Sequence, residues 1–247
     1  MFNLREKTAL ITGAAKRIGR SLAIELAKQG TNVVIHYNAS ETEAHTLRGD
    51  LIKLGVDAYL IKADLADPNS SSRLIEDSIT DAGELDILIN TASVFTAKSI
   101  QDANIADLNS VLMINAWTPF ILSKVFAQKV GHGRIINFLD TRNKGYDLDR
   151  FPYYLSKRML EILTRCLALK LSPNITVNAV APGLILPPAG KDISYLEKLK
   201  HTVPLKMYGS VSDVVDAVLF LLRSDFITGQ VIYVDGGKHL IQTFEGL

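Results

Sequence analysis

Cysteine is nearly absent from this chain of 247 residues, in which Cys166 is the single example. One thiol cannot form an internal disulfide, and it cannot supply a metal site built from several cysteines. Cys166 lies in the apolar stretch LTRCLALKL, so we expect it to fill part of the core. The chemistry of this protein therefore has to come from other side chains.

Excess charge and long hydrophobic runs are absent as well. Lys and Arg number 27 against 26 Asp and Glu, so a formal net charge of +1 gives no global attraction to nucleic acid or anionic membranes. There is no run of about 18 uninterrupted apolar residues, and the start MFNLREKTAL places charges where a secretory signal needs apolar residues. We expect a cytoplasmic protein whose partners are small molecules or copies of itself.

The spacing of the apolar residues predicts the fold. Hydrophobic residues make up 47% of the chain, which is enough for the core of a single domain over residues 1–247. Short β-branched runs alternate with longer segments of helical period, which predicts right-handed crossovers and a parallel sheet covered on both faces. The fold class is therefore a Rossmann-like, doubly wound α/β domain. The expected strands are 8–12, 32–36, 57–61, 85–90, 133–139, 175–180 and 230–234.

One long segment interrupts the alternation. Residues 185–209 follow the sixth expected strand, and Pro187, Pro188 and Gly190 disrupt regular structure there. A surface insertion without a function would have the same composition. We favour a lid over a pocket, because long loops in compact domains commonly serve a site.

A turn containing glycines follows the first expected strand. In TGAAKRIG, Gly13 and Gly19 would let the backbone approach a pyrophosphate, and the next helix would offer free N–H groups at its start. Glycines also occur at such turns for steric reasons alone, but the position in the first βα unit favours a dinucleotide site. Arg17 stands near the usual middle glycine, where a cation opposes the helix dipole unless an anion is bound.

The end of the second strand indicates which dinucleotide is preferred. A site for NAD normally has an acid here to bind the ribose hydroxyls, and HYNAS has none. His36, Asn38 and Ser40, together with Lys16 and Arg17, could donate hydrogen bonds or positive charge to a 2'-phosphate. A polar helix cap would explain Ser40 but not the missing acid. We infer NADP(H), with NADPH as the cofactor.

Tyr153 and Lys157 are four residues apart and should share one face of a helix over about 152–171. A free tyrosine titrates near a pKa of ~10, and a neighbouring ammonium lowers the free energy of the phenolate. Tyr154 has no lysine at the same offset. Because this spacing is common by chance, it carries weight only together with the other motifs.

Together these motifs resemble the short-chain dehydrogenase/reductase family over nearly the whole chain. The matching segments are TGAAKRIG, KADL, NTAS, INAWTPF, YYLSK, VAPG and FITGQVIYVDGG. The resemblance implies hydride transfer from a nicotinamide, with Tyr153 as acid and base, Lys157 on the nicotinamide ribose and Asn115 holding a water relay. It also implies cofactor contacts from Gly13, Lys16, Arg17, Ile18, His36, Asn38, Ser40, Asp64, Leu65, Ala92, Ser93, Tyr153, Lys157, Pro182 and Gly183.

Three departures from this family resemble the pteridine reductases. Asp140 replaces the usual catalytic serine, Ser93 replaces a glycine, and PGLILPP lacks the threonine often found after the PG turn. Phe95 follows Ser93 by two residues, and the segments KHL and GLIL are similar to the bacterial dihydromonapterin reductase branch. This resemblance implies that Phe95 stacks on the pterin and that Arg17 bridges it to the cofactor phosphate. The implied substrate contacts are Arg17, Ser93, Phe95, Asp140, Tyr153 and Leu184.

Asp140, 13 residues before Tyr153, fits the reduction of a C=N bond better than that of a ketone. A ketone oxygen gains negative charge, which a carboxylate repels, whereas a ring nitrogen ends neutral and protonated. At about 4 Å and an effective dielectric of ~20, Asp140 would disfavour a phenolate by roughly 4 kcal/mol, so Tyr153 should stay protonated. The alternative is that Asp-Thr-Arg-Asn is an ordinary turn after a strand.

We therefore predict an NADPH-dependent reductase of a dihydropterin such as dihydromonapterin, with dihydrofolate as a secondary substrate. The alternatives are a ketoreductase acting on 3-oxoacyl thioesters and a non-catalytic NADP-binding regulator. The family resemblance implies a homodimer or homotetramer paired through the helices near 106–130 and 152–171. The apolar residues of these helices could equally pack on the sheet.

Overall fold

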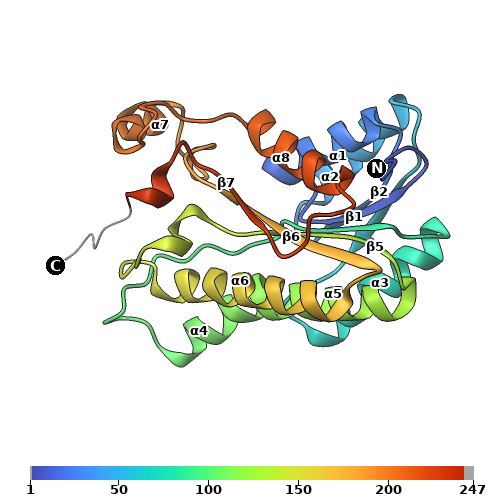
Figure 1. The fold of residues 1–247 in the computed structure, drawn as a ribbon, viewed down its shortest axis with the longest axis horizontal. Helices are drawn as coiled ribbons and strands as arrows, with labels where there is room; N and C mark the ends of the chain where they lie inside the picture. The colour runs from blue at the N-terminus through green and yellow to red at the C-terminus, as the bar shows by residue number, and fades with distance from the viewer. Residues whose placement is uncertain (1, 242–247) are drawn as a thin grey trace.

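Seven parallel strands form one sheet in the computed structural model, which describes residues 2–241 (Figure 1). The order is β3-β2-β1-β4-β5-β6-β7, and each predicted strand is confirmed. The strands are β1 (Thr8–Thr12), β2 (Asn32–Tyr37), β3 (Ala58–Lys62), β4 (Ile87–Asn90), β5 (Gly133–Phe138), β6 (Ile175–Pro182) and β7 (Val231–Val234). The Rossmann-like fold is therefore confirmed, since both faces of the sheet carry helices.

The helices form two layers. One layer contains α1 (Arg17–Lys28), α2 (Glu41–Lys53) and α8 (Val211–Arg223). The other contains α3 (Pro68–Ala82), α4 (Ile105–Leu112), α5 (Thr118–Val130) and α6 (Phe151–Leu171). The short elements are η1 (Met113–Trp117), η2 (Thr141–Lys144), α7 (Ser194–Leu199), η3 (Lys200–Thr202) and η4 (Lys238–Leu240).

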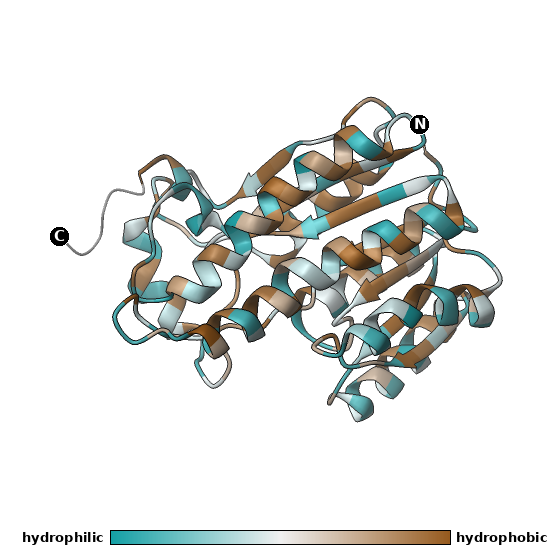
Figure 2. Ribbon diagram, turned by 90° about the horizontal axis from the view of Figure 1, so that it is seen from below, coloured by the Kyte–Doolittle hydropathy of each residue, from teal (hydrophilic) through white to brown (hydrophobic). Residues whose placement is uncertain are grey.

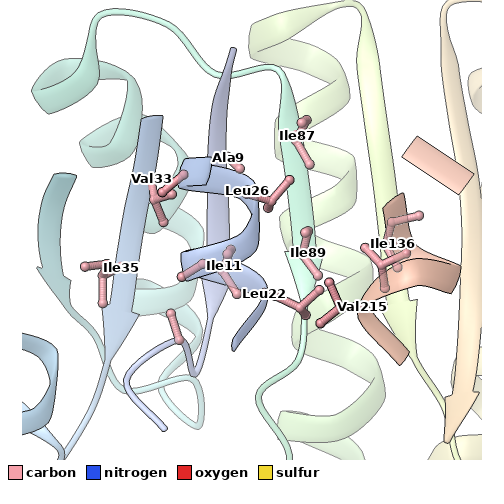
Figure 3. Close-up of a cluster of buried hydrophobic side chains, with 14 of the residues drawn as sticks. Ala9, Ile11, Leu22, Leu26, Val33, Ile35, Ile87, Ile89, Ile136 and Val215 are labelled. Carbon is pink, nitrogen blue, oxygen red and sulfur yellow. The ribbon is translucent and has the colours of Figure 1, made fainter. Parts of the chain in front are cut away.

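Alternate residues of each central strand enter opposite layers of the core. Ile11, Ile35 and Ile89 pack toward α1 and α8, as Figure 3 shows, whereas Leu10 and Leu88 pack toward α3 and α5. A parallel sheet covered on both faces requires nearly continuous apolar strands. Figure 2 shows this as apolar stretches along the strands and alternating polar and apolar residues along the helices.

The order of the strands reverses between β1 and β4. After β3 the chain crosses to the far side of β1, so the loops that leave the carboxyl ends of β1 and β4 diverge. Ligands of doubly wound sheets bind in the crevice at such a point. The turns after β1, β4, β5 and β6, which hold most of the predicted site residues, leave the same edge of the sheet.

Two expectations need correction. The helix expected near 106–130 is interrupted at η1, a π-helical turn that contains Asn115. The prediction that Cys166 fills the core is wrong, because its side chain is exposed. The apolar residues around it divide between two faces of α6, so that Leu167 is buried whereas Leu169 is 84% exposed.

Residues Ile105–Val130 are long and apolar enough to cross a membrane, with a mean hydropathy of 1.3, and they are the one such stretch in residues 2–241. This stretch consists of α4, η1 and α5, and Leu122 and Phe126 are fully buried in the core beside the sheet. Core helices commonly have the same length and composition. Packing within the domain therefore accounts for its hydropathy.

Candidate active site

The glycine turn after β1 has the shape that an anion-binding loop needs. Gly13 has φ +66°, and a Cβ on Gly19 would lie 2.6 Å from the carbonyl oxygen of Gly13. Arg17 adopts φ +55°, which is uncommon for a residue other than glycine. No acidic side chain lies in the first turn of α1, and Lys16 at its N-cap makes no side-chain capping bond. The backbone and the dipole of α1 therefore fit a pyrophosphate.

His36 does not lie where the sequence predicted. It is 2% exposed, its Nδ1 accepts the Gly13 N–H at 3.0 Å, and its Nε2 lies 3.1 Å from the carbonyl oxygen of Ala63. Burial lowers the pKa of His36 to about 4, so the ring is neutral at pH 7. The prediction that His36 contacts a 2'-phosphate is wrong, because both ring nitrogens are hydrogen-bonded to backbone groups inside the protein. The residue instead holds the glycine turn against β2 and β3.

The other residues expected at the 2'-phosphate lie at the surface. Lys16 forms a salt bridge of 2.8 Å with Glu43 in the first turn of α2, a partner that the sequence reasoning missed. Asn38 donates to Asp64 at 3.4 Å. Ser40 occupies the N-cap of α2 without a side-chain capping bond, so the cap interpretation does not account for its hydroxyl.

Three predicted cofactor residues help to shape the adjacent backbone. Ile18 packs against the core beneath α1. Leu65 is buried, and its carbonyl oxygen accepts from Thr118 at 2.8 Å. Ala92 follows β4, and its Cα would lie 3.1 Å from a Cβ on Gly13. The turns after β1 and β4 therefore touch.

The segment predicted to be a lid leaves β6 through Pro182 and Gly183 and contains the short helix α7. The carbonyl oxygen of Leu184 accepts the Gly209 N–H at 3.0 Å, which closes the base of the segment. Arg17 donates to the carbonyl oxygen of Pro187 at 2.9 Å. This bond links the glycine turn directly to the segment expected to cover the site.

Asn115 connects the turn after β4 to α6. Its Oδ1 accepts from the Ser93 hydroxyl at 3.2 Å and from the Val94 N–H at 2.8 Å. Its Nδ2 donates to the Val94 carbonyl oxygen at 2.9 Å and to the Ser156 hydroxyl at 3.1 Å. Both side-chain groups of Asn115 are thus engaged by residues of the described chain, so this side chain ties the turn after β4 to α6.

The centre of the site is a hydrogen bond from the Tyr153 hydroxyl to Asp140 Oδ2 at 3.0 Å. Tyr153 is 7% exposed, and burial together with the charge of Asp140 raises its pKa well above the ordinary value of 10. Arg142 opposes this shift but does not cancel it. The direction of this shift agrees with the expectation that the phenol stays protonated beside Asp140.

Arg142 is a site residue that the sequence reasoning missed. Its Nη1 lies 3.2 Å from Asp140 Oδ2, and its Nε lies 3.0 Å from Asp147 Oδ2. Burial opposes its charge, but the two carboxylates outweigh burial and raise the pKa of Arg142. In the sequence this arginine belongs to an ordinary turn after β5, and nothing in the neighbouring residues marks it as part of a site.

Lys157 lies one helical turn after Tyr153 on α6 and is 3% exposed. Its ammonium donates to the carbonyl oxygen of Phe138 at 2.8 Å and lies 5.7 Å from the centre of the Tyr153 ring. Burial lowers the pKa of Lys157 to about 8, and the charge of Asp140 opposes that shift. The lysine therefore titrates near pH 8.

Phe95 lies beside the phenol, with its ring 4.8 Å from that of Tyr153 at an interplanar angle of 70°. It is 54% exposed, so it is not a core residue. Arg142 and Arg150 lie 6.0 and 5.8 Å from the ring centre. An exposed aromatic ring beside a buried phenol can bind a flat ligand. No group of three or more potential metal ligands occurs within residues 2–241.

Comparisons with known proteins agree with this geometry. The family model described as Enoyl-(Acyl carrier protein) reductase matches residues 13–239. The chain is 31% identical to the 3-oxoacyl-[acyl-carrier-protein] reductase FabG of Staphylococcus aureus, covering 95% of this chain and 98% of that protein.

Two solved structures are also similar. FolM Alternative dihydrofolate reductase 1 from Brucella canis, complexed with NADP, has 29% identity and a TM-score of 0.91, covering 100% of this chain and 99% of that one. A blue fluorescent protein from a metagenomic library, in complex with NADPH, has 32% identity and a TM-score of 0.87, covering 96% and 99% of the two chains.

The buried His36 predicts a loss of stability in acid. The pKa of His36 falls from the ordinary 6.5 to about 4 on folding. Between these two pH values the unfolded chain binds a proton at His36 and the folded chain does not, so lowering the pH favours unfolding. The free energy of unfolding should fall by roughly 3 kcal/mol between pH 7 and pH 4 through this residue. Urea unfolding at a series of pH values measures this fall in the free energy of unfolding.

The variant His36→Asn should lack this component, and His45→Asn, on the exposed face of α2, should keep it. Parallel pH curves for the wild type and His36→Asn would contradict the assignment.

Proposed function

This chain belongs to the short-chain dehydrogenase/reductase family, and we propose that it uses NADPH to reduce a ring C=N bond of a dihydropterin. Dihydromonapterin is the preferred substrate in this proposal, and dihydrofolate is a secondary one. The observation that carries the proposal is the hydrogen bond between Tyr153 and Asp140. The similarity to the S. aureus FabG protein supports a 3-oxoacyl ketoreductase as the second candidate.

Asp140 favours the first candidate on electrostatic grounds. A carboxylate 3.0 Å from the phenol oxygen is badly placed for a reaction that builds negative charge on a substrate oxygen. In the reduction of a C=N bond the nitrogen takes up a proton and ends neutral. Asp140 can then accept a hydrogen bond from an N–H of the pterin, while Arg142 balances its charge.

Phe95 supports a flat heterocyclic substrate. Its exposed ring lies edge-on to Tyr153, so a planar ring stacked on Phe95 would lie beside the phenol hydroxyl. Ser93 and Leu184 border the same region and complete the proposed contacts, together with Arg17. The Brucella FolM protein, named as an alternative dihydrofolate reductase, aligns with this chain over its full length.

NADP(H) is the cofactor that the residues and the relatives indicate. When bound, it supplies the hydride. The turn from Gly13 to Arg17 would hold the pyrophosphate, and Lys157 would hold the nicotinamide ribose. Asn38, Ser40 and Lys16 would contact the 2'-phosphate, and Asp64 the adenine.

Tyr153 is the proton donor in this proposal. The raised pKa keeps the phenol protonated until the substrate nitrogen gains electrons. Lys157, 5.7 Å from the ring, would stabilise the phenolate left behind, and a water relay at Asn115 would return the proton.

Turnover of a substrate panel tests the proposed function. NADPH absorbance is followed with 7,8-dihydromonapterin, dihydrofolate and a 3-oxoacyl thioester, and the pterin is expected to be reduced fastest. Turnover of the thioester alone would establish the ketoreductase. Binding of NADPH without turnover of any substrate would establish a regulator.

Replacing Asp140 by the family's usual serine should exchange the two activities. We expect Asp140→Ser to lower kcat for dihydromonapterin by about tenfold or more, because Asp140 holds the hydroxyl of the general acid Tyr153, and general acid catalysis contributes at least that much. Reduction of the thioester should rise. The control Asp149→Ser changes an exposed acid in the same loop and should match the wild type. Unchanged pterin turnover in Asp140→Ser would contradict the proposal.

The pH profile should report Lys157. Its pKa of about 8 predicts that kcat/KM declines above pH 8, where the lysine loses its charge. Because Asp140 raises the pKa of Lys157, removing that charge in Asp140→Asn should move the decline to lower pH. Profiles for the wild type, Asp140→Asn and Asp149→Asn test the direction. A decline of kcat/KM in Asp140→Asn at the same pH as in the wild type, or at a higher pH, would contradict the assignment to Lys157.

We also propose a homodimer or homotetramer that pairs α6 between subunits. Leu122 and Phe126 of α5 pack on the sheet, but Ile162 and Leu169 of α6 are 61% and 84% exposed. The double variant Ile162→Lys, Leu169→Lys should lower the molar mass measured by light scattering toward 27.1 kDa. Ile52→Lys, at an exposed position of α2, should retain the assembly. A wild type that is monomeric would refute it.

A further inference from the structure

Asp235 lies just past β7 and has a side chain only 1% exposed, yet it takes no part in the chemistry described so far. Its carboxylate accepts the Gly237 N–H at 3.0 Å and the His239 N–H at 2.7 Å. It also accepts from the Thr141 hydroxyl and from Nδ1 of His239, the latter at 2.9 Å. These bonds lower the pKa of Asp235 although burial opposes them.

His239 completes this cluster from η4. Since a carboxylate only accepts hydrogen bonds, Nδ1 of His239 carries the proton that points to Asp235. The imidazole ring stacks on Tyr233, with centroids 4.2 Å apart and an interplanar angle of 22°. The ring is thus held by a hydrogen bond and by stacking, and η4 packs against η2.

The cluster joins segments that are far apart in the sequence. Thr141 and Asp235 are 94 residues apart, and a Cβ on Gly183 would lie 2.6 Å from the Cβ of Asp235. The N–H of Leu205, near the end of the proposed lid, donates to the carbonyl oxygen of Gly236 at 3.2 Å. The turn after β5, the turn after β6 and the lid therefore meet at the C-terminal end of β7, the end of the molecule that also carries α7 (Figure 1).

Thr141 directly follows Asp140, so the hydrogen bond from Thr141 to Asp235 affects the position of Asp140 beside Tyr153. Tyr153 is fixed by α6, whereas Asp140 lies at the start of the short turn η2. Asn143 attaches the far part of this turn to α6 through the Lys157 carbonyl oxygen at 3.0 Å. The Thr141 hydroxyl holds the part of the turn that carries Asp140, through its bond to Asp235.

We propose that Asp235 and His239 are positioning residues, which set the distance between Asp140 and Tyr153 by holding the Thr141 hydroxyl. This inference rests on the proposed function for the role of Asp140, and it adds the C-terminal turn to the site. An error of about 1 Å in such a placement can cost up to a hundredfold in rate.

Paired variants of Thr141 test the proposal. Thr141→Val keeps the shape but loses the donor, and kcat should fall roughly tenfold or more, while the Kd for NADPH stays within about twofold of the wild type. Thr141→Ser keeps the hydroxyl and should restore most of kcat. Thr80→Val, at an exposed threonine of α3, should match the wild type. A wild-type kcat in Thr141→Val, or an equal loss in Thr141→Ser, would overturn the proposal.

A second pair of variants tests the partners. Asp235→Asn weakens the acceptor and should lower kcat as Thr141→Val does. His239→Phe keeps an aromatic ring on Tyr233 but loses the Nδ1 donor, so its kcat should lie between those of Asp235→Asn and the wild type. A wild-type kcat in both variants would overturn the roles of Asp235 and His239.

Hydrogen exchange separates this proposal from the proposed function. If the wild type reduces only the thioester, the pterin assignment fails, and the same comparison of kcat is made with the thioester. If it reduces neither substrate, deuterium uptake over residues 140–145 tests whether the Thr141 hydroxyl holds this turn in place. Uptake should be faster in Thr141→Val and unchanged in Thr141→Ser. Equal uptake in Thr141→Val and the wild type would overturn the anchor.

Discussion

The hydrogen bond from the Tyr153 hydroxyl to the Asp140 carboxylate is the interaction on which the site depends. Burial and the charge of Asp140 together raise the pKa of the phenol and so keep it neutral, and the carboxylate lies where a reaction producing an alkoxide would suffer repulsion. Arg142 makes this arrangement tolerable, because a buried carboxylate needs a partner. The neutral phenol, the carboxylate and the guanidinium are therefore one connected group, and in the proposed function this group delivers a proton to a ring nitrogen.

Three parts of the fold position the residues of this site. Strand β5 ends at the turn of Asp140, α6 presents Tyr153 and Lys157 on successive turns, and the segment after β7 holds the turn through Asp235. Because all strands are parallel, their carboxyl ends meet at one edge, beside the glycine turn that fits a pyrophosphate. A reacting group between Tyr153 and the cofactor site would thus be held by elements that belong to the rigid core.

The relatives explain why fold and family do not decide the substrate. A 3-oxoacyl reductase and an alternative dihydrofolate reductase resemble this chain about equally in identity, and each aligns over nearly its full length. Function therefore has to be argued from the site, because one fold hosts many reactions. Asp140, Arg142 and the exposed Phe95 are the features of this chain that bear on that choice.

The sequence by itself determined the strands, their alternation with helices, the glycine turn and the pairing of Tyr153 with Lys157. These features are encoded by residues close together in the chain, through side-chain periodicity and local turn geometry. It also allowed the effect of Asp140 on Tyr153 to be predicted, since the family pattern brings their positions together.

Only the tertiary structure decided that His36 faces inward, that Cys166 is exposed, that Arg142 pairs with Asp140, and that Asp235 holds Thr141. The burial of a side chain and its choice of partner depend on which elements pack together. Asp235 and Thr141 meet across 94 residues, a contact for which the local sequence contains no signal.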